Sequence, residues 1–296
     1  MKRRGPFGYA APMPLRRRDL LLSSAVAPLA VAHAAPRRIR IPHVSAKAEL
    51  ERSYAAVLLA QALAAAGMTV SLEPTPDLIP QNRALQELGG HSGRLDVVWT
   101  MTSVEREQQA RPVRVPIFKG LYGWRLLLAS AGVAERMRGV QNLNELRQFS
   151  MVQGLEWPDT SILQANGLNV VVSPSYDAMF KQLRLGRADV FPRSVEEVWW
   201  ELERYGQGLT VVPNLCLHYP AAVYYFVAPD DTELAAAIEL GLQRLRASGA
   251  FERLFLKHHG DDLARAHLSA RKVIELHNPL LPPQTPLDKP ELWYRP

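Results

Sequence analysis

Short runs of β-branched and other apolar residues alternate with helical segments from residue 37 onward. Residues 37–44 have the alternating apolar positions of a strand, whereas the apolar spacing of residues 50–66 is helical and stops at Gly67. The near-continuous apolar run at 95–100 is typical of a strand that is buried on both faces of a parallel sheet. This alternation predicts a doubly wound α/β fold.

A second series of the same kind follows the first. We expect further strands at 70–72, 121–130, 149–153, 170–172, 188–191, 209–212 and 223–227. We expect further helices at 83–88, 141–147, 160–166, 175–185 and 195–205, and an amphipathic helix after Pro229 whose apolar stripe is Leu234, Ile238, Leu242 and Leu245. Because no long linker separates the two series, they predict two α/β lobes joined by short crossing strands.

Composition excludes several classes of protein. A chain of 296 residues that is 47% hydrophobic is too apolar to be disordered. Its single cysteine, Cys216, excludes a disulfide framework and a cysteine-based zinc ribbon, and we expect this thiol to be buried and inert. Residues 277–296 contain six prolines, so we expect an extended strap there rather than a helix or strand.

The net charge of +6 is concentrated at the start of the chain. Residues 1–34 begin with a basic stretch, continue with an uncharged apolar run and end in Ala32-His33-Ala34, which predicts a secretory signal peptide. Arg17-Arg18 is typical of twin-arginine export, with the general secretory route as the alternative. A second alternative is the first helix of a cytosolic protein.

The remainder of the chain is close to neutral, so the basic balance does not indicate a nucleic-acid partner. No later segment approaches the ~20 apolar residues that a membrane span requires. We therefore expect an exported periplasmic protein that is a monomer and has no membrane span in its mature part.

Three segments resemble the signatures of type II periplasmic solute-binding proteins, and most closely the polar amino acid-binding branch, solute-binding family 3. They are residues 93–106, which include Gly93-Arg94-Leu95-Asp96; residues 175–190; and residues 229–251. The resemblance implies two α/β lobes on two hinge strands, which close around a small solute. It implies a first lobe of 36–121 plus 222–276 and a second lobe of 122–221, with the tail 277–296 laid over the first lobe.

The resemblance also implies a carboxylate-binding arginine, which falls on Arg106, and hydroxyl groups upstream of it at Thr100, Thr102 and Ser103. A guanidinium group suits this role because its paired donors match the two oxygens of a carboxylate. The alternative for Arg106 is a solvated charge at the start of a helix.

The second-lobe signature departs from the family pattern. Ser194 stands where the family has an aspartate for the ligand ammonium group, and Arg193 precedes it. Arg193 therefore either contacts a second acidic group of the ligand or forms a salt bridge between the lobes. Glu196 and Glu197 are expected to be surface charges.

Two further segments supply candidate ligand contacts. Gly154 and Trp157 belong to a turn whose backbone N–H groups receive the carboxylate in the family, and such a turn before a helix suits an anion. Tyr122 and Trp124 lie at the first expected hinge. For all three aromatic residues, packing in the core or hinge is the alternative.

These observations favour a binding protein for a small carboxylate-bearing solute, amino acid-like or an organic anion, which would deliver it to an inner-membrane ABC permease. The alternative is a stand-alone receptor that signals to a membrane sensor; less favoured is a cell-wall or small-molecule lyase or hydrolase. We expect no catalytic residue, no cofactor and no metal site. His258, His259, Asp261 and Asp262 lack metal-ligand spacing and are expected on a solvated surface.

Overall fold

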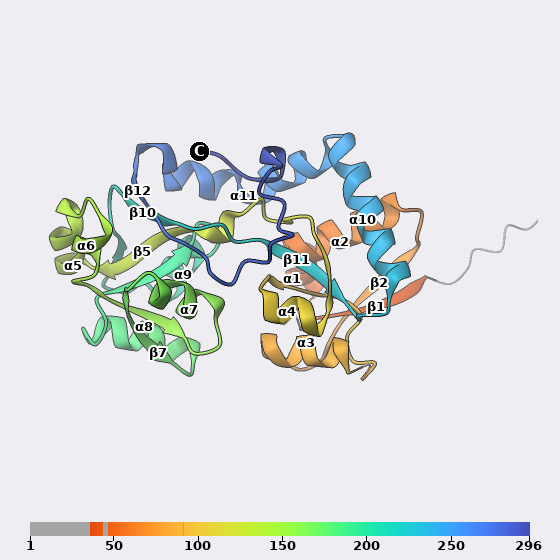
Figure 1. The fold of residues 1–296 in the computed structure, drawn as a ribbon, viewed down its shortest axis with the longest axis horizontal. Helices are drawn as coiled ribbons and strands as arrows, with labels where there is room; N and C mark the ends of the chain where they lie inside the picture. The colour runs from red at the N-terminus through yellow and green to blue at the C-terminus, as the bar shows by residue number, and fades with distance from the viewer. Residues whose placement is uncertain (1–35, 44–46, 91) are drawn as a thin grey trace, which may run out of the picture. The chain divides into compact units, whose positions relative to one another are not determined.

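The structure is a computed structural model that describes residues 36–43, 47–90 and 92–296. The expected signal peptide at 1–34 lies outside the described residues. The two groups of strands and helices described below are called the first and second lobes (Figure 1).

The first lobe contains a parallel pair of strands, β1 and β2, and an antiparallel sheet with the order β3-β11-β4. Asp96 connects them, because its carboxylate pairs with Arg40 of β1 at 2.6 Å just before β3 begins. The elements are β1 Arg37–Ile41, α1 Lys47–Arg52, α2 Tyr54–Ala65, β2 Val70–Pro74, α3 Gln81–Gly89, β3 Val98–Met101, α4 Val104–Gln109, β4 Arg111–Val113, β11 Val223–Val227 and α10 Thr232–Ala247.

The second lobe is built on the larger sheet, with the order β12-β10-β5-β8-β6-β7 and with β9 paired to β5. Its signature residue Asp189 accepts hydrogen bonds from the backbone and side chain of Ser150 and so holds the start of β8 against β6. The elements are η1 Leu121–Gly123, β5 Trp124–Ser130, α5 Ala131–Arg136, η2 Met137–Gly139, α6 Leu143–Leu146, β6 Ser150–Gly154, α7 Pro158–Ala165, β7 Asn169–Ser173, α8 Tyr176–Arg184, β8 Val190–Ser194, α9 Val198–Tyr205, β9 Leu209–Val211, β10 Leu215–His218 and β12 Lys272–Glu275.

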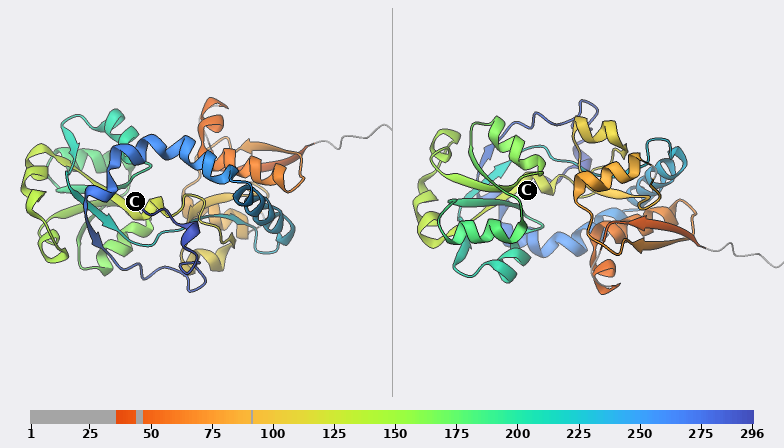
Figure 2. Two further views of the ribbon diagram at one scale, coloured as in Figure 1. Left: turned by 90° about the horizontal axis from the view of Figure 1, so that it is seen from above. Right: turned by 90° about the horizontal axis from the view of Figure 1, so that it is seen from below.

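One strand departs from the expected division of the chain. Residues 222–276 were expected in the first lobe, but β12 pairs in parallel with β10 of the second. The helix α11, Ala250–Ala266, leads there from the first lobe, and η3, Leu268–Ala270, follows it (Figure 2). Trp199 of the second lobe donates a hydrogen bond to the carbonyl of Asp262 on this helix. The chain therefore passes from the first lobe to the second along α11 as well, a crossing that the expected division does not contain.

The helix α11 also corrects the expectation for the paired histidines. His258 and His259 lie on this helix, and His259 is buried among Tyr54, Phe118 and Phe255. The solvated surface expected for His259 is therefore wrong.

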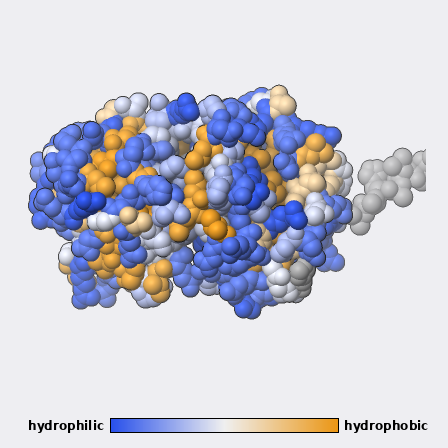
Figure 3. Space-filling model, in the orientation of Figure 1, coloured by the Kyte–Doolittle hydropathy of each residue, from blue (hydrophilic) through white to orange (hydrophobic). Residues whose placement is uncertain are grey.

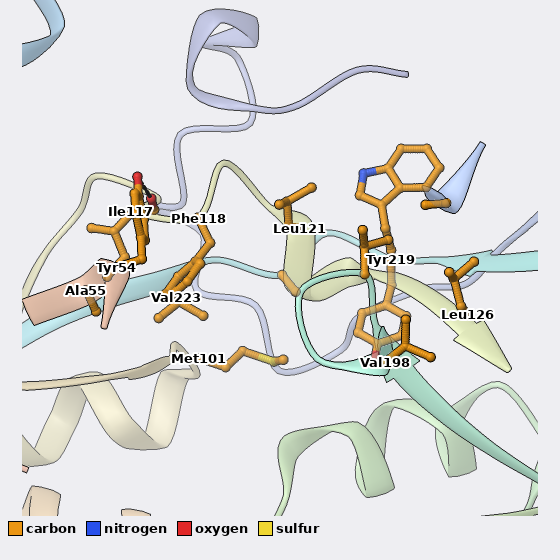
Figure 4. Packing of buried hydrophobic residues seen from close by; sticks show 14 of the residues in the cluster. Tyr54, Ala55, Met101, Ile117, Phe118, Leu121, Leu126, Val198, Tyr219 and Val223 are labelled. Carbon is orange, nitrogen blue, oxygen red and sulfur yellow. Dashed lines mark hydrogen bonds between the residues drawn. The ribbon is translucent and has the colours of Figure 1, made fainter. Parts of the chain in front are cut away.

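The hydrophobic core continues from one lobe to the other through the crossing segments. Tyr54 of α2 packs on Phe118 and donates a hydrogen bond to the carbonyl of Ile117, and the same cluster continues to Tyr219 and Leu126 (Figure 4). Cys216 is buried, as expected. Apolar residues on the face seen in Figure 3 are interspersed with hydrophilic ones.

The tail contacts both lobes. His277 exchanges two hydrogen bonds with Asn166 of the second lobe, and the carbonyl of Leu280 accepts from the first N–H of α4 in the first lobe. Further along, Trp293 packs against Gly120, whose φ of 77° and missing Cβ leave room for the indole ring. Only η4, Pro290–Leu292, is regular beyond residue 276 in the described chain, which agrees with the expected extended strap.

Candidate ligand-binding site

A cavity of about 170 Å³ lies where the two lobes meet, and it is called the central cavity. The first lobe contributes Gln81 and three residues of β3, the second lobe contributes the charged residues, and Tyr122 and Val223 come from the crossing segments. The lining residues are Gln81, Trp99, Thr100, Met101, Tyr122, Arg125, Trp157, Pro158, Asp159, Arg193, Glu197 and Val223.

Two buried arginines reach the central cavity from neighbouring strands of the larger sheet. Arg125 of β5 forms ion pairs with Asp159 and, at 3.5 Å, with Glu197. Arg193 of β8 pairs with Glu197 at 2.7 Å and with Glu201 at 2.6 Å. Glu197 and Glu201 both belong to the second lobe, so within the described part of the chain Arg193 forms no salt bridge between the lobes.

Aromatic rings also stabilise the buried guanidinium group of Arg193. Its guanidinium lies 4.8 Å from the centre of the Trp157 ring and 4.9 Å from that of Phe191, within the range of cation–π attraction. Arg125 differs, because its Nε has no hydrogen-bond partner among the described residues although the side chain is only 1% exposed. A buried donor without an acceptor in the wall of a cavity is a candidate ligand contact.

Glu197 is half-buried at the cavity wall, so the expectation of a surface charge is wrong for it. Its carboxylate accepts hydrogen bonds from the backbone N–H and the hydroxyl of Ser194. Burial by itself raises the pKa of Glu197, but Arg193 and Arg125 outweigh burial and hold that pKa below its usual value. An acid therefore does lie beside the position where the family has an aspartate, three residues further along the chain.

Arg106 lies on the first-lobe side, behind Thr100. It is 5% exposed, and its Nη1 donates to the Thr100 hydroxyl at 2.7 Å and to the Met101 carbonyl at 2.9 Å. Its Nη2 donates to the amide oxygens of Gln81 and Asn82. All four acceptors are neutral, and in the described part of the chain no carboxylate lies within ion-pair distance of this guanidinium.

Arg106 faces a second cavity of about 380 Å³, called the tail-side cavity because Pro279 and Leu280 form part of its wall. Ser103, whose hydroxyl caps α4 by accepting from the Arg106 N–H, lines it as well. The central and tail-side cavities share Trp157 and Pro158 in their walls. The two cavities therefore adjoin at the start of α7.

Six of the predicted site residues therefore lie on cavity walls. Thr100, Tyr122, Trp157 and Arg193 line the central cavity, and Ser103, Arg106 and again Trp157 line the tail-side cavity. Their contact with a ligand stays a prediction.

The remaining four predicted residues lie behind these walls. Thr102 donates to Glu107, Ser194 donates to Glu197, and Trp124 packs against His218 with the rings tilted by 31° and their centres 4.1 Å apart. Gly154 lies under the Trp157 ring, where a Cβ would come within 2.7 Å of the indole. In this structure each of the four packs against or hydrogen-bonds to a neighbouring residue. Direct contact of these four residues with a ligand also stays a prediction.

The sequence did not single out Arg125 and Asp159 as a pair. Trp157 is the N-cap residue of α7, and the carboxylate of Asp159 in the first turn of this helix meets Arg125 and the Tyr219 hydroxyl. An acid in the first turn of α7 was the available signal, since it places negative charge at the helix end that an anion would otherwise occupy.

Within the described ranges, no three His, Cys, Asp or Glu side chains are grouped so that they could hold a metal ion. No helix among those residues has the length and apolar character needed to cross a membrane.

Comparison of the sequence with family models gives no match, and no curated protein matches it. Comparison of the structure gives clear matches. A probable amino-acid ABC transporter extracellular-binding protein from Bacillus subtilis aligns with a TM-score of 0.57 and 18% identity over 77% of this chain and 100% of its own. The chain has the fold of type II periplasmic binding proteins.

Two other solved structures with this fold are similar to the chain. An ancestral arginine-binding protein bound to glutamine gives a TM-score of 0.56 and 16% identity over 77% of this chain and 100% of that one. A histidine kinase sensor domain with similarity to periplasmic binding proteins gives 0.54 and 19% over 76% and 96%. The resemblance inferred from the three motifs is therefore confirmed at the level of the fold.

Proposed function

We propose that this protein binds a small zwitterionic solute, amino acid-like in its head group, between its two lobes. The observation that carries the proposal is the position of Arg106, a buried guanidinium without a carboxylate partner among the described residues. It lies in the wall of the tail-side cavity, which adjoins the central cavity with its acidic residues Asp159 and Glu197. Such an arrangement matches a molecule that carries a carboxylate at one end and an ammonium group next to it.

The charges of the second lobe support the ammonium end. Arg125 and Arg193 are outnumbered there by the carboxylates of Asp159, Glu197 and Glu201. Asp159 acts across the lobes as well: burial lowers the pKa of Arg106, and the charge of Asp159 is the largest effect that opposes this. An ammonium group beside Asp159 and Glu197 would neutralise the excess.

The carboxylate end would lie against Arg106, at the boundary that the central and tail-side cavities share. Charge-assisted hydrogen bonds contribute about 1.5–3 kcal/mol each. One fork of this kind, together with stacking on Trp157 and several neutral hydrogen bonds, accounts for the about −8 kcal/mol of a micromolar complex. Because the solute would touch both lobes, it would favour a closed conformation by population shift.

We further propose that the mature protein acts in the periplasm after export on residues 1–34, as a binding protein rather than an enzyme, and passes its solute to an ABC permease. The B. subtilis extracellular-binding protein supports this direction. The histidine kinase sensor domain of the same fold favours a second candidate, a receptor that reports the solute to a membrane sensor. Genes for a permease or for a sensor beside this one would separate the two.

The test compares two conservative arginine variants of the full-length protein by isothermal titration calorimetry with each of the twenty amino acids. Arg106→Lys keeps the charge but loses the paired donors, so the tightest-binding amino acid should bind at least tenfold more weakly. Arg83→Lys, at an exposed position on the neighbouring α3, serves as the control and should leave the affinity unchanged. Equal affinity in Arg106→Lys and wild type would refute the assignment of Arg106.

A further inference from the structure

A third cavity, of about 230 Å³, lies beside the central one and has no part in the function proposed above; it is called the α11-side cavity. It shares Trp99 and Tyr122 with the central cavity, so these two rings separate the two spaces. Its lining residues are Arg52, Ser53, Tyr54, Ala55, Trp99, Phe118, Tyr122, Glu196, His258, His259 and Asp262.

Two carboxylates face this cavity without a cation. Glu196 precedes α9 and accepts a hydrogen bond from the Tyr122 hydroxyl at 3.2 Å, while Asp262 lies on α11. Neither has a Lys, Arg or His partner within ion-pair distance in the described ranges of the chain. By contrast, Glu197 and Glu201, on the same segment as Glu196, are both paired with Arg193.

The pKa values of both acids are raised, although the charge of Arg193 opposes the rise for Glu196 and that of Arg265 opposes it for Asp262. Burial raises the pKa of Glu196 to about 8, and the nearby charges of Glu197 and Asp262 add to this effect. Burial likewise raises the pKa of Asp262 to about 6. A cation placed between these carboxylates would relieve both penalties.

His259 supplies a third, independent sign of a ligand. The ring is only 3% exposed, and its Nε2 has no hydrogen-bond partner among the described residues although it belongs to the cavity wall. Burial lowers the pKa of His259 to about 3, so the ring is neutral near pH 7 and one of its nitrogens can accept a hydrogen bond. A buried polar atom left without a partner calls for a donor or acceptor from outside.

Aromatic rings form most of the remaining wall. Tyr54, Trp99, Phe118 and Tyr122 surround the space, with Tyr54 4.6 Å from His259 and Phe118 4.9 Å from Tyr122 between ring centres. Aromatic faces attract cations and also bury alkyl groups. The one arginine of the wall, Arg52, is exposed to solvent.

We propose that the α11-side cavity is a binding site for a primary alkylammonium ion, whose nitrogen donates hydrogen bonds to Glu196, Asp262 and His259 while its alkyl chain packs between Tyr54, Trp99 and Phe118. The site stands independently of the zwitterion site, since Glu196, Asp262 and His259 do not line the central cavity. The α2 N-terminus, which also borders the cavity, is already capped by the Ser53 hydroxyl and does not call for an anion.

The experiment titrates n-butylammonium chloride into the full-length protein at pH 9 by isothermal titration calorimetry. At this pH Glu196 is ionised, and a primary alkylamine, with a pKa near the 10.4 of lysine, is still charged. Wild type should bind with a Kd at or below ~1 mM, about −4 kcal/mol. Sodium butyrate, the matched anion, should not bind this site.

The variant Glu196→Gln/Asp262→Asn should bind n-butylammonium at least tenfold more weakly, because it removes both charges while the glutamine still offers an acceptor to Tyr122. Asp261→Asn is the matched control: it removes an exposed charge next to Asp262 and should bind as wild type does. Should the double variant fail to fold, Asp262→Asn alone should weaken binding at least threefold. Absence of wild-type binding, or equal binding by a folded charge-neutralised variant, would overturn the proposal.

The pH profile provides a second readout. The groups that act on Glu196 are Glu197, Tyr122, Asp262 and Arg193, and Arg52, His258 and His259 border the same space. Protonation of Glu196 removes its charge, so affinity for n-butylammonium should fall between pH 9 and pH 6 in wild type. In Glu196→Gln only a smaller fall should remain, from the protonation of Asp262, whose pKa is about 6; a fall of the same size as in wild type would contradict the role of Glu196.

Discussion

Individual charged residues in this protein have roles that depend on where the next helix begins. Glu196 and Glu197 were expected on the surface as part of a helix that starts at Val195, yet α9 starts only at Val198. The two glutamates therefore lie in the preceding turn, where Glu197 reaches Arg193 and Glu196 reaches Tyr122. Residue types alone do not reveal this, since the direction of a side chain in a turn is set by tertiary packing.

The position of Arg106 shows the opposite case, in which local sequence was informative. The motif predicted an arginine near upstream hydroxyl groups. The Arg106 guanidinium does donate a hydrogen bond to the Thr100 hydroxyl, and its backbone N–H donates one to the Ser103 hydroxyl. The partners Gln81 and Asn82 could not be predicted, because they come from a helix some 25 residues earlier in the chain.

The buried His259 predicts an acid-sensitive stability. In the unfolded chain its pKa returns to the ordinary 6.5, whereas burial holds it at about 3 in the folded chain. Between these values the unfolded state binds the extra proton, so stability present above pH 6.5 is lost as the pH falls. We expect the free energy of unfolding of wild type, relative to His259→Phe, to fall by about 2 kcal/mol between pH 7 and pH 5.

Urea denaturation at the two pH values measures this difference, and comparison with the variant removes the contribution of all other titrating groups. A difference that stays constant from pH 7 to pH 5 would mean that the folded protein protonates His259 freely. The inference that His259 is buried in its neutral form would then be wrong.

At the scale of the elements, apolar periodicity predicted most helices and strands, and long-range contacts decided the rest. The expected helix at 50–66 is divided, because Ser53 caps a new helix, α2, at its start. The strand β10 was missed: its four residues are too few to show a period, and its pairing partners β5 and β12 lie far away in the chain. In contrast, the apolar stripe of α10 was predicted correctly, and its members are buried.

The close contact between α10 and α2 predicts that a single methyl group added at Gly241 lowers the stability of the fold. A Cβ on Gly241 of α10 would lie 1.8 Å from the backbone oxygen of Ala62 on α2, so one of the two helices would have to move. We expect Gly241→Ala to lower the free energy of unfolding by about 2–3 kcal/mol, as overpacking typically does. Chemical denaturation measures the loss.

Gly260 in the middle of α11 is the matched control. A Cβ there meets no atom within 4 Å, so Gly260→Ala should stabilise the protein by about 0.5–1 kcal/mol through helix propensity alone. If Gly241→Ala were as stable as Gly260→Ala, the close packing of α10 on α2 would be contradicted.

At the scale of the whole described chain, the tail and α11 join the lobes in addition to the two expected hinge segments. The proline content predicted an extended tail, but its path could not be predicted, because long-range hydrogen bonds of Asn166, Asn278 and Val104 fix it. We propose that this strap limits how far the lobes separate.

Removal of the strap should therefore remove contacts that hold the two lobes together and lower the stability of the protein. A chain that ends at Leu276 loses the contacts of Trp293 with Gly120 and of Leu280 with α4. We expect its midpoint of thermal unfolding to fall by about 5 °C or more, which for a chain of this size corresponds to roughly 2 kcal/mol. Differential scanning calorimetry of the two chains measures the shift, and an unchanged midpoint would show that the tail adds nothing to the fold.

The central claim, a zwitterion site between the lobes, is tested most directly by thermal unfolding of the full-length protein with amino acids and their singly blocked derivatives. Ligands that bind the folded state raise its midpoint by mass action. The account predicts that at least one amino acid raises the midpoint, while its amide, which lacks the carboxylate, and its N-acetyl derivative, which lacks the ammonium group, do not. If no amino acid raises the midpoint, or if both blocked derivatives raise it as much as the parent amino acid, the account is contradicted.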